Sequence, residues 1–379
     1  MRVLNVNALL DANTGGGCAE RTFQLSRAFA LEGIDTTVLT LDLALTEERR
    51  RALGNVNVIA LPCIQRRFRV PRFDFARLVA LAKAVDVVHI TDHWTPLNAM
   101  AYLAARRAGT PHVVCPAGAL AIYGRSKILK RAFNYAVGYE LIRNAAAWVA
   151  ITAAEQPQFA AYGVDPARVR VVPNGVELAD FADHDTAGFR RRVGLGEEPF
   201  VLFMGRLSPI KGPDILLDAF ARLRGDLARY HLVFAGPDEG LGESLRRFAS
   251  KKGLSGRVHF AGHVSAIERA SAYRAADLLV VPSRQEAMSL VALEAGACGK
   301  PVLISAQCGF DEVERSGGGL VALATPAALA EALNHLLCHP EKLRAMGNRL
   351  YALVAERYTW KAAVVRYADI FSSLLRAGS

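Results

Sequence analysis

The chain has 379 residues, 52% of them hydrophobic and 8% aromatic, which suits two folded α/β domains rather than one. No run approaches the roughly 18 apolar residues of a transmembrane helix, and the opening MRVLNVNALL lacks the layout of a signal peptide. The six cysteines are scattered without CxxC pairs, which argues against a disulfide framework or a zinc site. We therefore expect a cytoplasmic protein.

The formal net charge of +10 is unevenly distributed. Residues 1–170 hold 21 Lys and Arg against 13 Asp and Glu, a net +8. The cationic clusters are Arg49–Arg51, then Arg66, Arg67, Arg69 and Arg72, then Arg125, Lys127, Lys130 and Arg131. This charge indicates either a solvated basic face or attraction to the inner membrane leaflet or a phosphate-bearing acceptor. No aromatic-interleaved basic motif supports a nucleic-acid partner.

Strands and helices are expected to alternate from the first residues onward. Val3–Asn7 is typical of a strand, a loop with Gly15, Gly16 and Gly17 follows, and a helix is expected over Ala19–Leu31. Further strands are expected at Thr36–Leu41, Val85–Ile90, Pro111–Cys115 and Trp148–Thr152. This alternation predicts a parallel, doubly wound sheet.

The pattern changes near RVRVVPNGVE (168–177), where a short strand meets a Pro-Asn-Gly turn. We place the domain boundary there, with a first domain over 1–172 and a second domain over 173–358. A final helix, over 359–379, is expected to pack back on the first domain.

A second alternation of strands and helices then begins. Its expected segments are Phe200–Met204, Pro213–Leu223, His231–Ala235, Glu243–Lys252, Val258–Ala261, Ile267–Ala275, Leu278–Val281, a helix that carries Glu294, and Pro301–Ile304, with a helical tail from Pro326. Two doubly wound domains bring two carboxyl-edge clefts face to face, which is where such sheets bind ligands.

The stretch SRQEAMSLVALEAGACGKP (283–301) is the strongest candidate for chemistry. An apolar strand ends just before it, so the helix that follows offers its N-terminal N–H groups and positive dipole to an anion such as phosphate. Glu286 and Glu294 are better suited to accept hydrogen bonds from the hydroxyls of a sugar or ribose. Together they favour a site for a sugar phosphate or nucleotide sugar.

The segment GRLSPIKG (205–212) adds two cations after the Phe200–Met204 strand. Arg206 and Lys211 can neutralise a diphosphate, the arginine through its fork and the lysine as a point charge. Ordinary exposed basic residues in a loop are the alternative interpretation.

With AGPDEG (235–240), GGGCAER (15–21), VVPNGVE (171–177) and EAGACGKPV (294–302), these motifs resemble the retaining glycosyltransferases of family 4, which have the GT-B fold. The motifs follow the family's order across nearly the whole chain. The resemblance implies an enzyme that acts without a bound metal or other cofactor. It also implies two Rossmann-like domains that face a central cleft, with residues 1–172 on the acceptor side and residues 173–358 binding the nucleotide-sugar donor.

The resemblance implies roles for particular residues. Arg206 and Lys211 match the pair that holds the donor diphosphate, Glu294 the residue that takes the ribose hydroxyls, and Glu286 the residue near the reaction centre. His93 in HITDHWTP (89–96) resembles the family's cleft histidine. The expected catalytic residues are thus Glu286, His93, Arg206 and Lys211. The expected donor-binding residues are Gly16, Gly17, Gly205, Arg206, Lys211, Glu286, Ala287, Met288, Ser289, Leu290 and Glu294.

The chain departs from the family directly after Glu286. The family usually has Gly-Phe-Gly or Asn-Phe-Gly there, whereas this chain has Ala287, Met288 and Ser289. Glycine lets a backbone approach a ligand closely, so this difference affects the sugar-facing part of the site. The acceptor side is expected to include Asp92, Tyr123, Arg125 and Lys127, the last three within PAGALAIYGRSKILKR (116–131).

The predicted activity is transfer of a sugar from a UDP-sugar or GDP-sugar to a hydroxyl acceptor, with retention of configuration. The setting implied by the family and the charge is assembly of a surface polysaccharide, lipopolysaccharide or glycolipid at the inner face of the membrane. Two alternatives stay open: a catalytically silent partner subunit that binds nucleotide sugar, and a nucleotide-sugar epimerase on the same fold.

Overall fold

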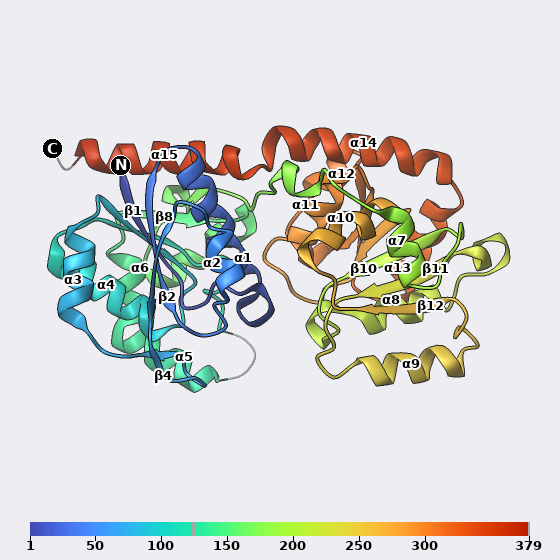
Figure 1. The fold of residues 1–379 in the computed structure, drawn as a ribbon, viewed down its shortest axis with the longest axis horizontal. Coiled ribbons are helices and arrows are strands. Elements are labelled where there is room, and N and C mark those ends of the chain that lie inside the picture. The colour runs from blue at the N-terminus through green and yellow to red at the C-terminus, as the bar shows by residue number, and fades with distance from the viewer. Residues whose placement is uncertain (123–125, 378–379) are drawn as a thin grey trace. The chain divides into compact units, whose positions relative to one another are not determined.

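The structure, a computed structural model, describes residues 1–122 and 126–377. The described chain separates into two compact units. The first comprises Met1–Asn174 together with the C-terminal residues from Trp360 onward, and the second comprises Gly175–Thr359. Each unit is built around its own parallel sheet (Figure 1).

In the described part of the first unit, seven parallel strands form a sheet of order β3-β2-β1-β6-β7-β8-β9. These strands are β1 (Arg2–Val6), β2 (Asp35–Leu41), β3 (Asn57–Leu61), β6 (Val87–Thr91), β7 (His112–Cys115), β8 (Ala147–Ala150) and β9 (Arg170–Val171). The short pair β4 (Cys63–Gln65) and β5 (Val70–Pro71) is antiparallel and separate from this sheet. The α-helices are α1 (Ala12–Leu31), α2 (Glu47–Arg51), α3 (Phe75–Lys83), α4 (Pro96–Ala108), α5 (Lys127–Phe133), α6 (Tyr139–Arg143) and α15 (Trp360–Ala377).

The predicted loop around Gly15–Gly17 lies inside α1, so that part of the sequence interpretation was wrong. The helix begins earlier because the Asp11 carboxylate accepts from the Thr14 N–H at 2.9 Å and caps it. Gly16 alone leaves the helical conformation, with φ 63° and ψ −150°, and kinks the helix. A φ of this sign is inexpensive for glycine.

The C-terminal helix α15 belongs to the first unit and packs against α1 (Figure 1). Arg21 of α1 is buried and donates to Tyr367 Oη of α15 at 3.0 Å. The same guanidinium donates to the carbonyl of Val172 at 2.9 Å and to Asn174 Oδ1 at 2.8 Å. One arginine therefore ties α1, the final helix and the end of the first unit together.

In the second unit, six parallel strands have the order β12-β11-β10-β13-β14-β15. They are β10 (Phe200–Met204), β11 (His231–Ala235), β12 (Val258–Gly262), β13 (Leu278–Val281), β14 (Val302–Ser305) and β15 (Gly319–Ala322). The α-helices are α7 (Thr186–Arg192), α8 (Pro213–Phe220), α9 (Gly242–Lys251), α10 (Ala266–Ala275), α11 (Leu290–Ala297), α12 (Glu312–Arg315), α13 (Pro326–Leu337) and α14 (Pro340–Arg357). Helices lie on both faces of the sheet, with α8 and α9 on one side and α10 and α11 on the other (Figure 1). Strands covered on both faces are apolar throughout, as LLVV in β13 illustrates.

Candidate functional site

Both sheets reverse their strand order at one point, and the predicted site residues follow the strands on either side of it. In the second unit the reversal lies between β10 and β13. Arg206 and Lys211 follow β10, and Glu286 follows β13. A crevice forms at the carboxyl ends of parallel strands where the order reverses, and ligands of such sheets bind there.

The loop that carries Lys211 is held against the end of β13. The carbonyl of Ile210 accepts from the Arg284 N–H at 2.8 Å. Gly212 has φ 69°, and a Cβ at this position would lie 2.3 Å from the carbonyl oxygen of Pro282. Only glycine allows the two backbones to come this close. This close contact places the loop after β10 beside the residues that follow β13.

Lys211 and Glu286 meet as a result of this packing. Lys211 Nζ lies 2.9 Å from Glu286 Oε1, and the Ser283 hydroxyl donates to Glu286 Oε2 at 2.8 Å. The Glu286 side chain is only 12% exposed. An ammonium has three N–H donors, so Lys211 can keep this bond and still donate to a ligand oxygen.

Arg206 takes a different partner from Lys211. Its Nη1 lies 2.8 Å from Glu239 Oε1, in the loop after β11, and both side chains are partly exposed. The two loops also form an isolated parallel bridge between Leu207 and Asp238. Glu239 lies within AGPDEG, but the sequence interpretation gave it no role. A guanidinium has five N–H donors and is not exhausted by one carboxylate.

Glu294 is buried in α11 and held by two residues of α10. Arg269 Nη1 lies 2.7 Å from Oε1, and the Tyr273 hydroxyl donates to Oε2 at 2.6 Å. Burial, reinforced by the carboxylate, raises the pKa of Tyr273 well above its usual value. Sequence reasoning missed both partners. Their i, i+4 spacing places them on one helical face, but nothing in the pattern indicates which carboxylate they meet.

The four residues after Glu286 form the entry to α11. Met288 and Ser289 are buried, and Ser289 is the N-cap, with its hydroxyl accepting from the Ala292 N–H at 3.4 Å. The Ser289 N–H donates to the carbonyl of Cys308 at 3.2 Å. Ala287 and Leu290 are half-buried. The first-turn N–H groups of a helix have no partner within it, so this end attracts an anion.

In the first unit the order reverses between β1 and β6. Gly16 and Gly17 follow β1 within α1, and a Cβ added to either would have no atom within 4 Å. Asp92 and His93 follow β6. The backbone at both glycines is therefore open to close approach by a ligand.

His93 is fully buried, with 0% of its surface exposed. Its Nε2 lies 2.9 Å from Asn134 Oδ1, in the π-helical turn η1 (Asn134–Gly138), and its Nδ1 has no hydrogen-bond partner among the described residues. The rings of Trp94 and Phe133 pack on it at 4.5 and 5.4 Å. Burial lowers the pKa of His93 to about 4, so the ring is neutral at pH 7.

Two of the remaining predicted residues are described: Asp92 follows β6 directly before His93, and Lys127 lies on helix α5. Asp92 has φ 69°, and its carboxylate accepts from the His93 N–H at 2.6 Å. Burial raises the pKa of Asp92 above its usual value, against the effect of that hydrogen bond. Lys127 is exposed at the start of α5. Tyr123 and Arg125 lie outside the described residues.

No group of three or more His, Cys, Asp or Glu side chains in the described part of the chain is arranged to hold a metal ion. No helix among the residues described here is both long and apolar enough to cross a membrane.

Two family models match the chain, one in each half. The model "Glycosyl transferase 4-like domain" matches residues 16–175, and "Glycosyl transferases group 1" matches residues 186–352. A protein of Geodermatophilus obscurus named D-inositol 3-phosphate glycosyltransferase is 36% identical over 299 residues, which cover 74% of this chain and 64% of that protein. A protein of the same name from Mycobacterium tuberculosis is 39% identical over 209 residues, which cover 53% of this chain and 42% of that protein. The chain thus matches less than two thirds of the length of these curated relatives.

Solved structures show the same fold. Anabaena HepE in complex with UDP superposes with a TM-score of 0.81 at 21% identity, covering 98% of this chain and 100% of that one. WaaG, a glycosyltransferase involved in lipopolysaccharide biosynthesis, superposes with a TM-score of 0.69 at 19% identity. The match covers 97% of this chain and 99% of WaaG. The two parallel sheets and the C-terminal helices are those of the GT-B fold. The chain belongs to the glycosyltransferase group 1 family, the retaining glycosyltransferases of family 4.

Proposed function

We propose that this chain transfers a sugar from a nucleotide diphosphate sugar to a hydroxyl acceptor, with retention of configuration and without a bound metal. The observation that carries the proposal is the contact of Lys211 with Glu286 at the point where the second sheet reverses its strand order. It joins a cation suited to a diphosphate with a carboxylate suited to sugar hydroxyls. The N-terminus of α11 follows four residues after Glu286.

The donor is proposed to bind along this edge of the second sheet. Lys211, Arg206 and the first turn of α11 would hold the diphosphate, and Glu294 would accept from the ribose hydroxyls. The Glu294 carboxylate accepts from Arg269 and Tyr273 of α10, and a ribose hydroxyl would be a further donor to it. The fold match to HepE with bound UDP supports a UDP-sugar as the first donor to test.

In the proposed reaction, the bond between the anomeric carbon and the donor phosphate oxygen breaks. The acceptor oxygen bonds to that carbon from the same face, and its proton passes to the leaving diphosphate. Negative charge accumulates on the diphosphate as it leaves, so Lys211 and Arg206 would bind the transition state more strongly than the ground state. Glu286 would orient the sugar hydroxyls near the reaction centre.

The first-unit roles rest on resemblance to the family. Gly16 and Gly17 are proposed to let the backbone approach the donor, and His93 to contact the transferred sugar. The neutral ring and the unpartnered Nδ1 of His93 are compatible with such a contact. Asp92 and Lys127 are proposed to serve the acceptor.

The acceptor is proposed to carry a phosphate group. Two observations support this class: the relatives named D-inositol 3-phosphate glycosyltransferase and the +8 charge of residues 1–170. A phosphate-bearing acceptor gains from long-range attraction to a basic domain. We propose glycolipid or surface-polysaccharide assembly as the setting.

A peripheral contact with an anionic membrane on the cytoplasmic side belongs to the same proposal. Apolar side chains on α5 and η1 are strongly exposed, at 80% for Ile128 and 91% for Tyr135, close in sequence to the exposed cations Lys127 and Arg131. Apolar groups with neighbouring cations are the composition of interfacial helices. Binding to vesicles that contain anionic lipid should therefore weaken with added salt and on replacing Ile128 and Tyr135 with Ser.

Release of nucleotide diphosphate, measured over UDP-sugars and GDP-sugars, is the direct test of the function. Each donor is paired with inositol phosphate, with unphosphorylated inositol and with a lipid-linked phosphate. The expected result is release that depends on both a donor and a phosphate-bearing acceptor. Binding of a donor without turnover would favour the silent partner, and interconversion of nucleotide sugars without net release would favour the epimerase.

A further inference from the structure

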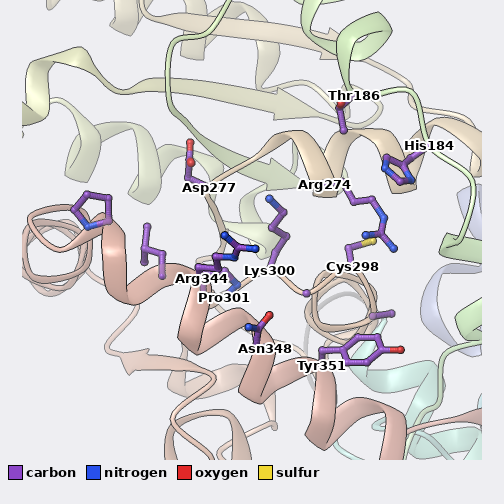
Figure 2. Close-up of a pocket in the computed structure, with 14 residues that line it drawn as sticks. His184, Thr186, Arg274, Asp277, Cys298, Lys300, Pro301, Arg344, Asn348 and Tyr351 are labelled. Carbon is purple, nitrogen blue, oxygen red and sulfur yellow. The ribbon is translucent and has the colours of Figure 1, made fainter.

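A cavity of about 730 Å³ opens in the second unit, at the edge of the sheet opposite to the proposed donor site (Figure 2). Asp277 immediately precedes β13, and Lys300 and Pro301 immediately precede β14, so the cavity lies at the amino ends of these strands. Glu286 follows the carboxyl end of β13. A four-residue strand spans roughly 13 Å. The two sites therefore lie at opposite ends of β13, separated by at least the length of that strand.

The walls of the cavity carry an excess of positive charge. Arg274 comes from α10, Lys300 from the turn before β14, and Arg344 from α14, whereas Asp277 is the single carboxylate among the lining residues. Figure 2 shows the Lys300 and Arg344 side chains extending into the space between Asp277 and Arg274. Three cations facing one carboxylate leave a local charge that an anion would neutralise.

These cations are not consumed by ion pairs. Arg274 donates to the carbonyl of Phe181 at 3.1 Å, and among the described residues neither Lys300 nor Arg344 has an acidic side chain within 4.0 Å. Lys300 is half-buried, and burial lowers its pKa. The charge of Asp277 opposes this shift without forming a salt bridge, and an anionic ligand in the cavity would stabilise the ammonium further.

The carboxylate indicates what else the ligand carries. Asp277 Oδ2 accepts from the Phe200 N–H at 2.8 Å, and its other oxygen is left for a donor. A carboxylate repels a bare phosphate but accepts from hydroxyls. The cavity is also lined by Asn348, which has an amide, and by Tyr351, which is 45% exposed. The volume falls in the range of small-molecule sites, about 300–1,000 Å³, and exceeds what a single phosphate fills.

We propose that this cavity is a second ligand site, which binds a small sugar phosphate or polyol phosphate through Arg274, Lys300 and Arg344 on the phosphate and Asp277 on a hydroxyl. The site does not depend on glycosyl transfer. The proposal therefore stands or falls separately from the function proposed above.

Titration calorimetry of the full chain with glucose 6-phosphate, inorganic phosphate and glucose tests it. Saturable binding of glucose 6-phosphate is expected, with at least about tenfold weaker binding of glucose and of inorganic phosphate. Arg344→Ala removes an exposed side chain and should leave the fold intact, yet weaken glucose 6-phosphate about tenfold or more. Lys300→Met should do the same, and Lys342→Ala, elsewhere on α14 and exposed, is the matched control.

Two further variants separate the competing explanations. Asp277→Asn should weaken glucose 6-phosphate but not inorganic phosphate, because the hydroxyl acceptor is altered and the phosphate contacts remain. Lys211→Ala should leave the binding unchanged, because that residue lies at the other edge of the sheet. The proposal is overturned by absence of binding up to about 10 mM, by equal losses in Arg344→Ala and Lys342→Ala, by loss in Lys211→Ala, or by inorganic phosphate binding as tightly as glucose 6-phosphate.

Discussion

Lys211 and Glu286 are 75 residues apart in the chain, yet the ammonium of one lies 2.9 Å from the carboxylate of the other. The contact exists because the strands that precede them, β10 and β13, are neighbours in the sheet although they are far apart in sequence. It places a cation for the donor diphosphate and a carboxylate for the sugar in one hydrogen-bonded unit.

Lys211→Ala should reduce kcat/KM for sugar transfer by about 100- to 1,000-fold, the range seen when one transition-state donor is lost. Far-UV circular dichroism should be unchanged, since a partly exposed loop lysine contributes little to the fold. Lys251→Ala, an exposed lysine of α9, is the matched control and should retain full activity. Near-normal turnover by Lys211→Ala would refute the assignment to the diphosphate.

Glu286→Gln should separate kcat from binding. The amide keeps the size of the side chain but removes a negative charge beside the proposed diphosphate, so affinity for the nucleotide diphosphate should be unchanged or higher. The kcat should fall at least about tenfold, because a charged acceptor for the sugar hydroxyls is lost. Calorimetry with UDP and steady-state kinetics give the two readings. A parallel loss of affinity would mean that Glu286 serves the fold of the loop instead.

The strands of both sheets could be predicted from the sequence because parallel strands covered on both faces are short apolar runs, as in FVLFM and LLVV. One edge strand of each sheet, β3 and β15, was missed; both carry short apolar runs, NVIAL and GLVA, but are only partly buried. The start of α1 was missed because three glycines disfavour a helix, whereas the Asp11 cap stabilises one.

Residues of the candidate site could be named by motif, but not their partners. The pairing of Arg206 with Glu239 and of Glu294 with Arg269 and Tyr273 depends on how neighbouring loops and helices pack, over separations of 21 to 33 residues. The burial of His93 depends on rings from α5 and the residues after β8. Such long-range contacts leave no local pattern.

Tyr273→Phe tests the support of Glu294. The substitution removes a 2.6 Å hydrogen bond to a buried carboxylate, so the free energy of unfolding should fall by about 1–3 kcal/mol. UDP affinity should also fall, but by less than in Glu294→Ala, because Arg269 still holds the other oxygen. Urea denaturation and calorimetry measure the two effects. Tyr135→Phe, which is 91% exposed, should change neither.

The buried, neutral His93 should make the protein less stable in mild acid. Its pKa is lowered from 6.5 to about 4, so the unfolded state binds the proton more tightly, and stability is lost as the pH falls below about 6.5. Between pH 7 and 5 this one group should account for about 2 kcal/mol of the loss. His93→Gln should shrink the difference between the unfolding free energies at the two pH values by that amount. His339→Gln, an exposed histidine, should leave the difference as it is; an equal pH dependence in wild type and His93→Gln would contradict the account.

Gly212→Ala tests whether the close contact between the Lys211 loop and β13 creates the site. Gly212 and Gly253 have nearly the same positive φ, 69° and 70°, so alanine carries the same conformational cost at both, about 1 kcal/mol or somewhat more. A Cβ at Gly212 would lie 2.3 Å from the Pro282 carbonyl oxygen, whereas at Gly253 nothing lies within 4 Å. Both variants should be destabilised, but only Gly212→Ala has to move the loop away from β13 and separate Lys211 from Glu286. Its kcat/KM should fall toward that of Lys211→Ala, while Gly253→Ala keeps wild-type kinetics once folded. If the two variants lose stability and activity alike, the loop contact is not what brings Lys211 to Glu286.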